Sequence, residues 1–218
     1  MRAARAVDTR GFTLIELVMV IIVLAVLAAV GVSTFGNRLE TAKVEQTKRE
    51  MDQLAKAIVG DADVYGNGTR GDFGYVGDVG SLPPNLDALV TNPGGYATWQ
   101  GPYVEAGLQA GDFKKDGWGV AYVYIDTLIR STGSGTNIDK VFARSTAALV
   151  SNTVRGVVRD ANLVPPGNVY RDSLQLLLTY PDGSGSTTTT ATLPNASGGF
   201  QFNGVPIGNH QLRAIYLP

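Results

Sequence analysis

The longest apolar run in the chain lies close to its N-terminus. No charged residue interrupts the stretch from Leu17 to Val32. Between Phe12 and Phe35, polar side chains occur at four positions: Thr13, Glu16, Ser33 and Thr34. As a helix rising about 1.5 Å per residue, this segment would be about 36 Å long, which exceeds the roughly 30 Å hydrocarbon core of a bilayer. The pattern therefore predicts a transmembrane helix.

The helical pattern continues past the apolar run. Neither glycine nor proline occurs from residue 37 to residue 59. Several apolar residues in and near this stretch fall close to one helical face: Leu39, Ala42, Met51, Leu54, Ala55 and Ile58. We therefore predict one helix over residues 12–59, about 72 Å long. Its first half is apolar all round, and its second half is amphipathic and should pack on a domain.

Residues 60–148 have the pattern of a small globular part with short elements. The glycine-rich stretch 60–80 predicts a loop. The segment Leu82–Val90 predicts a short helix, because its prolines suit a helix start and its leucines share a face. Asp116–Tyr124 reads as a turn followed by an alternating strand, and residues 131–139 read as a hairpin loop. A small antiparallel sheet is therefore expected to cover the second half of the long helix.

The last part of the chain, residues 149–218, has the pattern of an all-β region. Turn sequences rich in proline, glycine and asparagine separate five strand-like segments. These predicted strands are 154–159, 173–180, 187–193, 199–202 and 210–216. Their length and spacing favour a small sandwich. The predicted fold class is therefore α+β, with a long N-terminal helix on a small antiparallel sheet, followed by a β-sandwich.

Composition and charge narrow the possible functions. The chain has 218 residues, a net charge of −1 and no cysteine. The near-neutral charge gives no electrostatic reason to expect nucleic acid as a partner. Three arginines precede the apolar run against the single acid Asp8: Arg2, Arg5 and Arg10. Because positive residues stay on the cytoplasmic side, the bulk of the chain is expected outside the cell's inner membrane.

The sequence carries no enzyme signature and no convincing metal site. His210 is the only histidine, so a periplasmic hydrolase with a Ser-His-Asp triad would have to use it. It lies in a predicted strand between Asn209 and Gln211, which favours a surface histidine. Calcium needs six to eight oxygen ligands, and near the 131–139 loop only Asp126 and Asp139 supply carboxylates. A plain hairpin loop is therefore the default expectation, with calcium binding as the alternative, and no other cofactor is predicted.

The residues Gly11-Phe12-Thr13-Leu14-Ile15-Glu16, followed by the apolar run, resemble the prepilin-type motif of type IV pilins and type II secretion pseudopilins. The resemblance implies that a prepilin peptidase cuts after Gly11, removing residues 1–11 as a leader, and that Phe12 becomes N-methylated. It further implies an inner-membrane assembly platform as a partner and a homo- or hetero-oligomeric filament as the product. The mature protein would first be a single-pass inner-membrane protein in contact with lipid and then part of a periplasmic or extracellular filament.

Glu16 is the one charge inside the predicted membrane segment. A carboxylate in hydrocarbon costs a few kcal/mol unless it has a partner. The resemblance implies that Glu16 pairs with the free α-amine at Phe12 of a neighbouring subunit, which would remove most of that cost. The alternative is that Glu16 reaches the membrane interface near the helix end.

Many pilins have a proline near the position of Ser33, and this chain has none.

Two further segments resemble known protein parts. Residues 82–124 are similar to the periplasmic part of major pseudopilins, although Gly117 stands where that family usually has proline. The segments Gly156–Asp160 and Gly199–Ala214 resemble the carboxypeptidase regulatory-like, transthyretin-like sandwich, a non-catalytic accessory module. The first resemblance favours a secretion pseudopilin, and the second favours a specialised or minor pilin.

These observations predict a structural filament subunit. The alternative is a single-pass, membrane-anchored extracytoplasmic binding module that does not polymerise. The two hypotheses differ in one respect that can be tested, because only the filament subunit requires Gly11 and Glu16.

Overall fold

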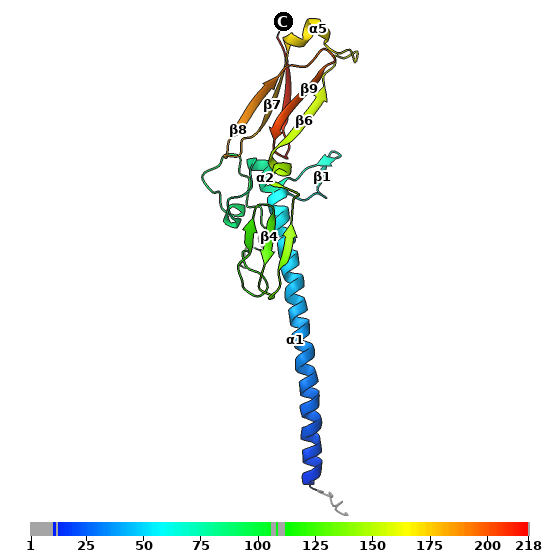
Figure 1. Ribbon diagram of the computed structural model, residues 1–218, viewed down its shortest axis with the longest axis vertical. Coiled ribbons are helices and arrows are strands. Elements are labelled where there is room, and N and C mark those ends of the chain that lie inside the picture. Colours follow the sequence, from blue (N-terminus) through cyan, green and yellow to red (C-terminus); the bar gives the residue numbers. More distant parts are fainter. Residues whose placement is uncertain (1–10, 12, 106–107, 109–111, 218) are drawn as a thin grey trace, which may run out of the picture. The chain divides into compact units, whose positions relative to one another are not determined.

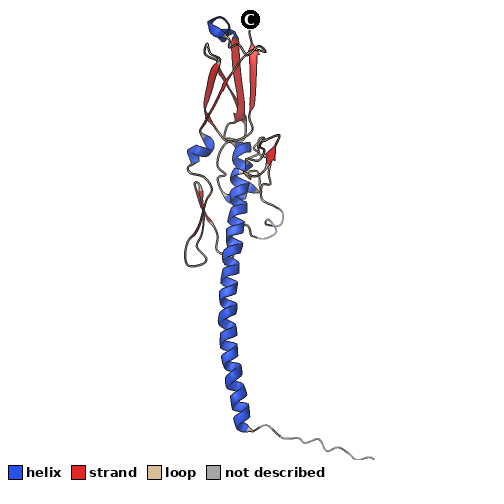
Figure 2. Cartoon of the chain, turned by 90° about the vertical axis from the view of Figure 1, so that its right-hand side faces the viewer, coloured by secondary structure: helices blue, strands red, loops and turns tan. Residues whose placement is uncertain are grey.

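The computed structural model describes residues 11, 13–105, 108 and 112–217, and within the first helix it leaves out the side chains of residues 29–37. The chain forms two compact units, residues 1–44 and residues 45–218. The helix α1, Leu14–Val59, contains 46 residues and contributes to both units (Figures 1 and 2). The predicted helix over 12–59 is therefore confirmed, with its first turn two residues later than expected.

The side chains of α1 from Leu14 to Ala28 are exposed. Leu14 is 81% exposed and Leu24 is 59% exposed, and the apolar residues between them are exposed as well. In the part of the chain that the structure describes, no helix is both long and apolar enough to cross a membrane.

The buried face of α1 begins later than the sequence pattern predicts. Leu39 is 61% exposed and Ala42 is also exposed, although both fit the apolar face of the helical pattern. Burial starts at Thr47 and continues through Met51, Leu54 and Ile58. These residues lie within the second unit, whose packed elements supply their neighbours.

The helix ends at a glycine that the structure requires. Gly60 has φ +80 and its amide donates to the carbonyl of Lys56 at 2.7 Å. A Cβ at this position would lie 2.4 Å from the carbonyl oxygen of Asp72. The left-handed conformation and the close backbone approach both exclude a side chain here, so Gly60 is a true C-terminal stop.

Short elements surround the second half of α1. They are β1 Tyr65–Gly66, β2 Thr69–Arg70, α2 Gly74–Val79, η1 Leu86–Leu89, β3 Val123–Ile125, β4 Leu128–Ser131, β5 Ile138–Val141 and α4 Thr146–Val150. The strands β3, β4 and β5 form an antiparallel sheet in that order, as expected from the sequence. The predicted helix at 82–90 appears as the shorter η1. The prediction of a plain loop over 60–80 is incomplete, because α2 forms there.

The helix α2 forms because it buries apolar side chains, although its short sequence shows no helical pattern. Tyr75, Val76 and Val79 are fully buried and pack with Met51 and Leu54 of α1 in one apolar core. Six residues are too few to display a helical period, so the glycines dominated the sequence pattern.

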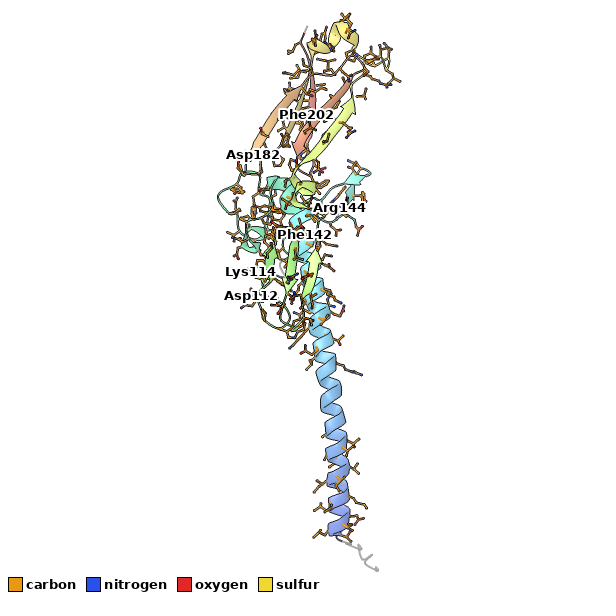
Figure 3. The ribbon with its side chains drawn as sticks, viewed as in Figure 1. Asp112, Lys114, Phe142, Arg144, Asp182 and Phe202 are labelled. Atoms are coloured by element: carbon orange, nitrogen blue, oxygen red, sulfur yellow. The ribbon has the colours of Figure 1, made fainter. Side chains whose placement is uncertain are left out.

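The C-terminal region contains all five predicted strands, with bounds that differ by a few residues at some ends. Its elements are β6 Asn152–Val157, α5 Gly167–Tyr170, η2 Arg171–Ser173, β7 Leu174–Pro181, β8 Thr187–Thr192, β9 Gly199–Val205 and β10 Gln211–Tyr216. Two antiparallel sheets form, one in the order β10-β7-β8 and one pairing β6 with β9. Leu176 and Leu178 from β7 and Phe202 and Val205 from β9 make a second apolar core. Figure 3 labels Phe202. The α+β fold class is confirmed, and the likeness to a regulatory-like module stays a prediction.

Within the second unit, the C-terminal strands β6–β10 are joined to the elements around α1 by backbone hydrogen bonds as well as by the chain. The amide of Gly183, in the β7–β8 turn, donates to the carbonyl of Val79 at 2.9 Å. The amide of Ile207, between β9 and β10, donates to the carbonyl of Leu149 at 2.7 Å. The predicted division between residues 148 and 149 stays a prediction.

Candidate functional site

The N-terminal motif is the first candidate site. Gly11 is exposed, and a Cβ built on it would meet nothing within 4 Å. Phe12 lies outside the described residues, as do Asp8 and the arginines Arg2, Arg5 and Arg10. The predicted roles of Gly11 and Phe12 in cleavage, and of Phe12 in methylation, therefore stay predictions.

Glu16 caps the start of α1 together with Thr13. The Thr13 hydroxyl oxygen accepts a hydrogen bond from the Glu16 amide at 3.3 Å. In return, Glu16 Oε2 accepts from the amide and from the hydroxyl of Thr13, both at 3.2 Å. Thr13 directly precedes the first helical residue, so this is a reciprocal capping box, which satisfies two amides that the first turn leaves without helical partners. The sequence signal for it, Thr-x-x-Glu before an apolar run, was present and was not used in the prediction.

The capping box fixes where the Glu16 charge lies. The carboxylate sits at the helix N-terminus, where the helix dipole favours a negative charge. Phe12 is the neighbour of Thr13 in the chain, so a cut after Gly11 would create a cationic amine one residue from the cap. The arrangement therefore places a carboxylate and a potential amine at the same end of the apolar helix.

A second polar centre lies in the Asp116 turn and is structural. Asp116 is 5% exposed and accepts hydrogen bonds from the Ser131 hydroxyl at 2.6 Å and from three amides at 2.9–3.0 Å. Those amides belong to Trp118, Val120 and Gly133. Burial by itself would raise the pKa of Asp116, but these four hydrogen bonds outweigh it and hold the pKa below its usual value.

The same turn is tied to the long helix. The amide of Gly117 donates to the hydroxyl of Thr47 at 3.0 Å, and Thr47 is fully buried on α1. The predicted turn is thus confirmed. Its anchoring function was not foreseen, because a threonine in the charged half of α1 gives no sign of its distant partner.

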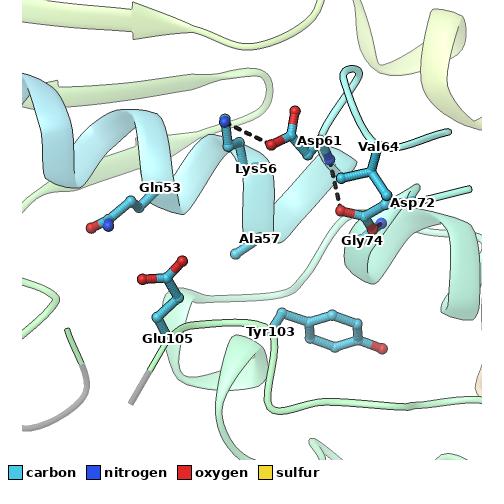
Figure 4. A pocket seen from close by; sticks show the side chains of 9 residues that line it. All are labelled: Gln53, Lys56, Ala57, Asp61, Val64, Asp72, Gly74, Tyr103 and Glu105. Atoms are coloured by element: carbon cyan, nitrogen blue, oxygen red, sulfur yellow. Dashed lines mark hydrogen bonds and ion pairs between the residues drawn. The ribbon is translucent and has the colours of Figure 1, made fainter. Parts of the chain in front are cut away.

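A small polar pocket lies beside the end of α1 (Figure 4). Its volume is about 240 Å³. Lys56 pairs with Asp61 at 2.7 Å, while Asp72 accepts from the amides of Asp61 at 2.8 Å and Gly74 at 2.9 Å. These contacts hold the residues after α1 in place. Among the described residues, no group of three histidine, aspartate or glutamate side chains is placed to hold a metal ion.

The two aspartates considered for calcium have other surroundings. Asp139 accepts two hydrogen bonds from Arg130, at 2.6 and 2.7 Å, and this pairing lowers the pKa of its carboxyl. Asp126 lies in the turn before β4 with φ +50, whereas Asp139 faces Arg130 near the far end of β4. Residues 132–137 form the hairpin loop that was the default expectation.

His210 is half-buried, and the expectation of a surface position is wrong. It precedes β10, its Nε2 lies 2.7 Å from the carbonyl oxygen of Pro206, and its ring packs edge-on against Tyr180. The nitrogen next to the carbonyl must carry the proton to donate this bond. His210 thus holds the loop between β9 and β10.

Comparisons with known proteins found one family model and two relatives of the same name. The model of the prokaryotic N-terminal methylation motif matches residues 8–32. The type II secretion system core protein G of Xanthomonas campestris is 33% identical over 96 residues, which are 44% of this chain and 57% of the relative. The protein of the same name from Pseudomonas aeruginosa is 34% identical over 118 residues, 53% of this chain and 72% of the relative. The matches thus span about half of this chain and, in the Xanthomonas relative, little more than half of that protein. No solved structure matches the chain.

Proposed function

This chain belongs to the family of the type II secretion system core protein G, the pseudopilins, and from that premise we propose that it is a structural subunit of a pseudopilus or a related type IV pilus-like filament. The observation that carries the proposal is the motif match over residues 8–32, which includes Gly11, Phe12 and Glu16. Members of this class are filament subunits and not enzymes, in keeping with the absence of an enzyme signature in the sequence.

The proposal includes a sequence of steps. The chain enters the inner membrane with its first arginines in the cytoplasm and its C-terminal part outside. Prepilin peptidase cuts after Gly11, and Phe12 is then N-methylated. Assembly on an inner-membrane platform moves the apolar helix from lipid into the core of a filament, together with other pilins or pseudopilins. The uncharged run from Leu17 to Val32 supports both the membrane stage and the filament stage.

Glu16 has a defined part in this proposal. In the isolated chain its carboxylate accepts hydrogen bonds only from Thr13 among the described residues, and it keeps lone pairs for another donor. We propose that the α-amine of Phe12 in a neighbouring subunit supplies that donor in the filament. The pairing would neutralise a charge in an apolar setting and fix the register between adjacent subunits.

The test is co-expression of the full chain with a prepilin peptidase, followed by mass spectrometry of the mature N-terminus. We expect a chain that begins with N-methylated Phe12, and an uncut chain when the peptidase is left out. Gly11→Val should prevent the cut. Gly66→Val is the matched control, because Gly66 also has no atom near its missing Cβ. An intact Met1 would overturn the proposal. So would a cut at the small residues near Ala29, where an ordinary signal peptide would be cut.

A second candidate function is a membrane-anchored binding module that does not polymerise. A cavity of about 650 Å³ in the C-terminal region, lined by Val158, Tyr170 and Tyr216 among others, favours some binding activity. This alternative predicts that the protein works normally without cleavage at Gly11, so the same experiment combined with a functional assay separates the two.

A further inference from the structure

The two sheets of the C-terminal region differ in width. The sheet β10-β7-β8 has three strands, whereas the sheet β6-β9 has two. β8 and β9 lie side by side, so the narrower sheet is short of a strand on the side of β10. The interior face of the wider sheet is therefore covered along only part of its width.

The register shows which residues are left uncovered. Three leucines of β7 have partners directly opposite them on β10. The pairs are Leu178 with Leu212, Leu176 with Ala214, and Leu174 with Tyr216. Residues directly opposite each other in an antiparallel pair project from the same face of the sheet. Leu176 and Leu178 are buried, yet Leu212 is 48% exposed and Tyr216 is 55% exposed. The apolar interior face thus continues onto β10 and opens to solvent there.

A cavity of about 650 Å³ lies along this uncovered face. Ala214 and Tyr216 line one side, and Val158, which follows β6, lines the other. Val169 and Tyr170 of α5 close one end, and they are 77% and 56% exposed. The volume falls within the range of roughly 300 to 1,000 Å³ found for ligand sites.

The strand β6, whose next residue Val158 lines the cavity, has an unpaired edge. Among the described residues, β6 is hydrogen-bonded to β9 alone. The Val158 amide donates to the carbonyl of Gly198 at 2.9 Å. Because hydrogen-bonding groups alternate along a strand, the amides and carbonyls of Arg155 and Val157 point away from β9, toward the open side. An apolar cavity would accept many compounds, but only an extended polypeptide also satisfies a free strand edge.

The charges near the groove are unbalanced. Two arginines lie beside the free edge, Arg155 on β6 and Arg159 just after it, and neither forms an ion pair with a described residue. The nearby carboxylates are already engaged, because Asp160 accepts from the amides of Asn162 and Val164, and Asp172 pairs with Arg171. The groove therefore favours an occupant with acidic side chains.

We infer that this groove, between β6 and β10, binds an extended segment of another polypeptide, with apolar residues at alternate positions and acidic residues beside them. The segment pairs with the free edge of β6, and its apolar side chains cover Leu212, Ala214 and Tyr216. The inference does not depend on the proposed filament function, because a monomeric anchored protein would present the same groove.

The test is selection of a phage-displayed random 12-residue peptide library on the full, detergent-solubilised chain. Enriched peptides should alternate apolar and polar residues and contain more Asp and Glu than Lys and Arg. Val157→Pro removes an edge amide and should weaken binding of these peptides at least tenfold. Leu212→Ser combined with Tyr216→Ser should do the same by removing the apolar face. Arg155→Glu combined with Arg159→Glu should weaken binding and reduce its salt dependence.

The control is Val141→Ser, which changes an apolar residue that is 63% exposed on another edge strand, β5. It should leave peptide binding unchanged, and all variants should melt at the wild-type temperature because the altered side chains are exposed. Absence of any enriched peptide would overturn the inference. So would binding that survives Val157→Pro, which would indicate an apolar ligand that needs no strand edge. Self-association of the chain that these same variants abolish would identify a second copy as the occupant and would also overturn it.

Discussion

At the level of a single residue, Glu16 has one observed function and one proposed function, and they call for different properties of the side chain. The capping box with Thr13 needs a hydrogen-bond acceptor, which glutamine also provides. The proposed pairing with a neighbouring α-amine needs a negative charge, which glutamine lacks. A substitution that keeps the acceptor and removes the charge therefore separates the two.

We predict that Glu16→Gln blocks filament assembly while leaving cleavage and methylation intact. The capping bonds remain in this variant, so only the attraction between subunits is lost. Thr13→Val is the complementary change, because it removes the cap and keeps the charge; it should destabilise the first turn by about 1 kcal/mol and permit assembly. Sheared filaments collected by sedimentation give the measurement. Normal filament yield with Glu16→Gln would show that capping is the residue's whole function.

Asp116 supports a prediction about stability and pH. Asp116→Asn places amide hydrogens against groups that donate to the carboxylate, so it should lower the free energy of unfolding by about 2 kcal/mol at pH 7. Because folding lowers the pKa of Asp116, its contribution is fully present above the ordinary pKa of about 4 and is lost as pH falls through the folded value.

Urea unfolding of the detergent-solubilised chain between pH 3 and pH 7 measures both effects. The wild type should lose stability toward pH 3 more steeply than Asp116→Asn. Asp112→Asn is the control, since its pair with Lys115 is exposed and should contribute little to stability. If the free energy of unfolding changed with pH in the same way in the wild type and in Asp116→Asn, the proposed contribution of the Asp116 carboxylate would be refuted.

At the level of elements, the predictions succeeded where a pattern extends over enough residues. The helix α1 and the five C-terminal strands were predicted because periods of 3.6 and 2 repeat many times in them. The helix α2 was missed because it is one turn and a half long and lies among glycines. Leu39 and Ala42 fit the apolar face but are exposed, since sequence periodicity cannot tell where a packing partner begins. The capping box could have been predicted from the sequence. The Thr47–Gly117 contact could not, because it joins residues far apart in the chain.

Gly80 illustrates how a short element depends on one residue. It ends α2 with φ +83, and a Cβ there would lie 2.5 Å from the carbonyl oxygen of Pro181 and 3.0 Å from the amide nitrogen of Gly183. The close approach permits the hydrogen bond from Gly183 to Val79. The glycine therefore supports both the helix end and the contact with the C-terminal region.

We predict that Gly80→Ala lowers stability clearly more than the 1–2 kcal/mol that a left-handed backbone alone costs an alanine. The control is Gly95→Ala, at φ +71, where an added Cβ meets nothing within 4 Å. It isolates the backbone cost from the steric cost. Thermal unfolding of the two variants gives the comparison, and equal losses would mean that the backbone at Pro181 moves aside without penalty.

At the level of the whole molecule, the C-terminal region is packed onto the rest of the second unit. Ile207 lies between β9 and β10, yet its side chain packs against the core formed by α1 and α2. The amide of Ala97 also donates to the carbonyl of Gly185, at 2.8 Å, in the β7–β8 turn. The sequence suggested an added module after residue 148, because a strand pattern says nothing about which of its turns contact the preceding domain.

These contacts lead to a prediction about truncation. Removing residues 151–218 should lower the melting temperature of the remaining part by several degrees, because it exposes apolar surface around Val79, Tyr96 and Leu149 and leaves backbone groups without partners. Both tryptophans of the chain, Trp99 and Trp118, lie outside the deleted segment. Their fluorescence therefore reports the unfolding of the same part in the full and truncated chains. Ile207→Ser in the full chain removes one apolar contact. Its melting temperature should lie between those of the full and the truncated chain. An unchanged melting temperature on truncation would instead support an independent module, attached only through the chain, with its boundary near residue 148.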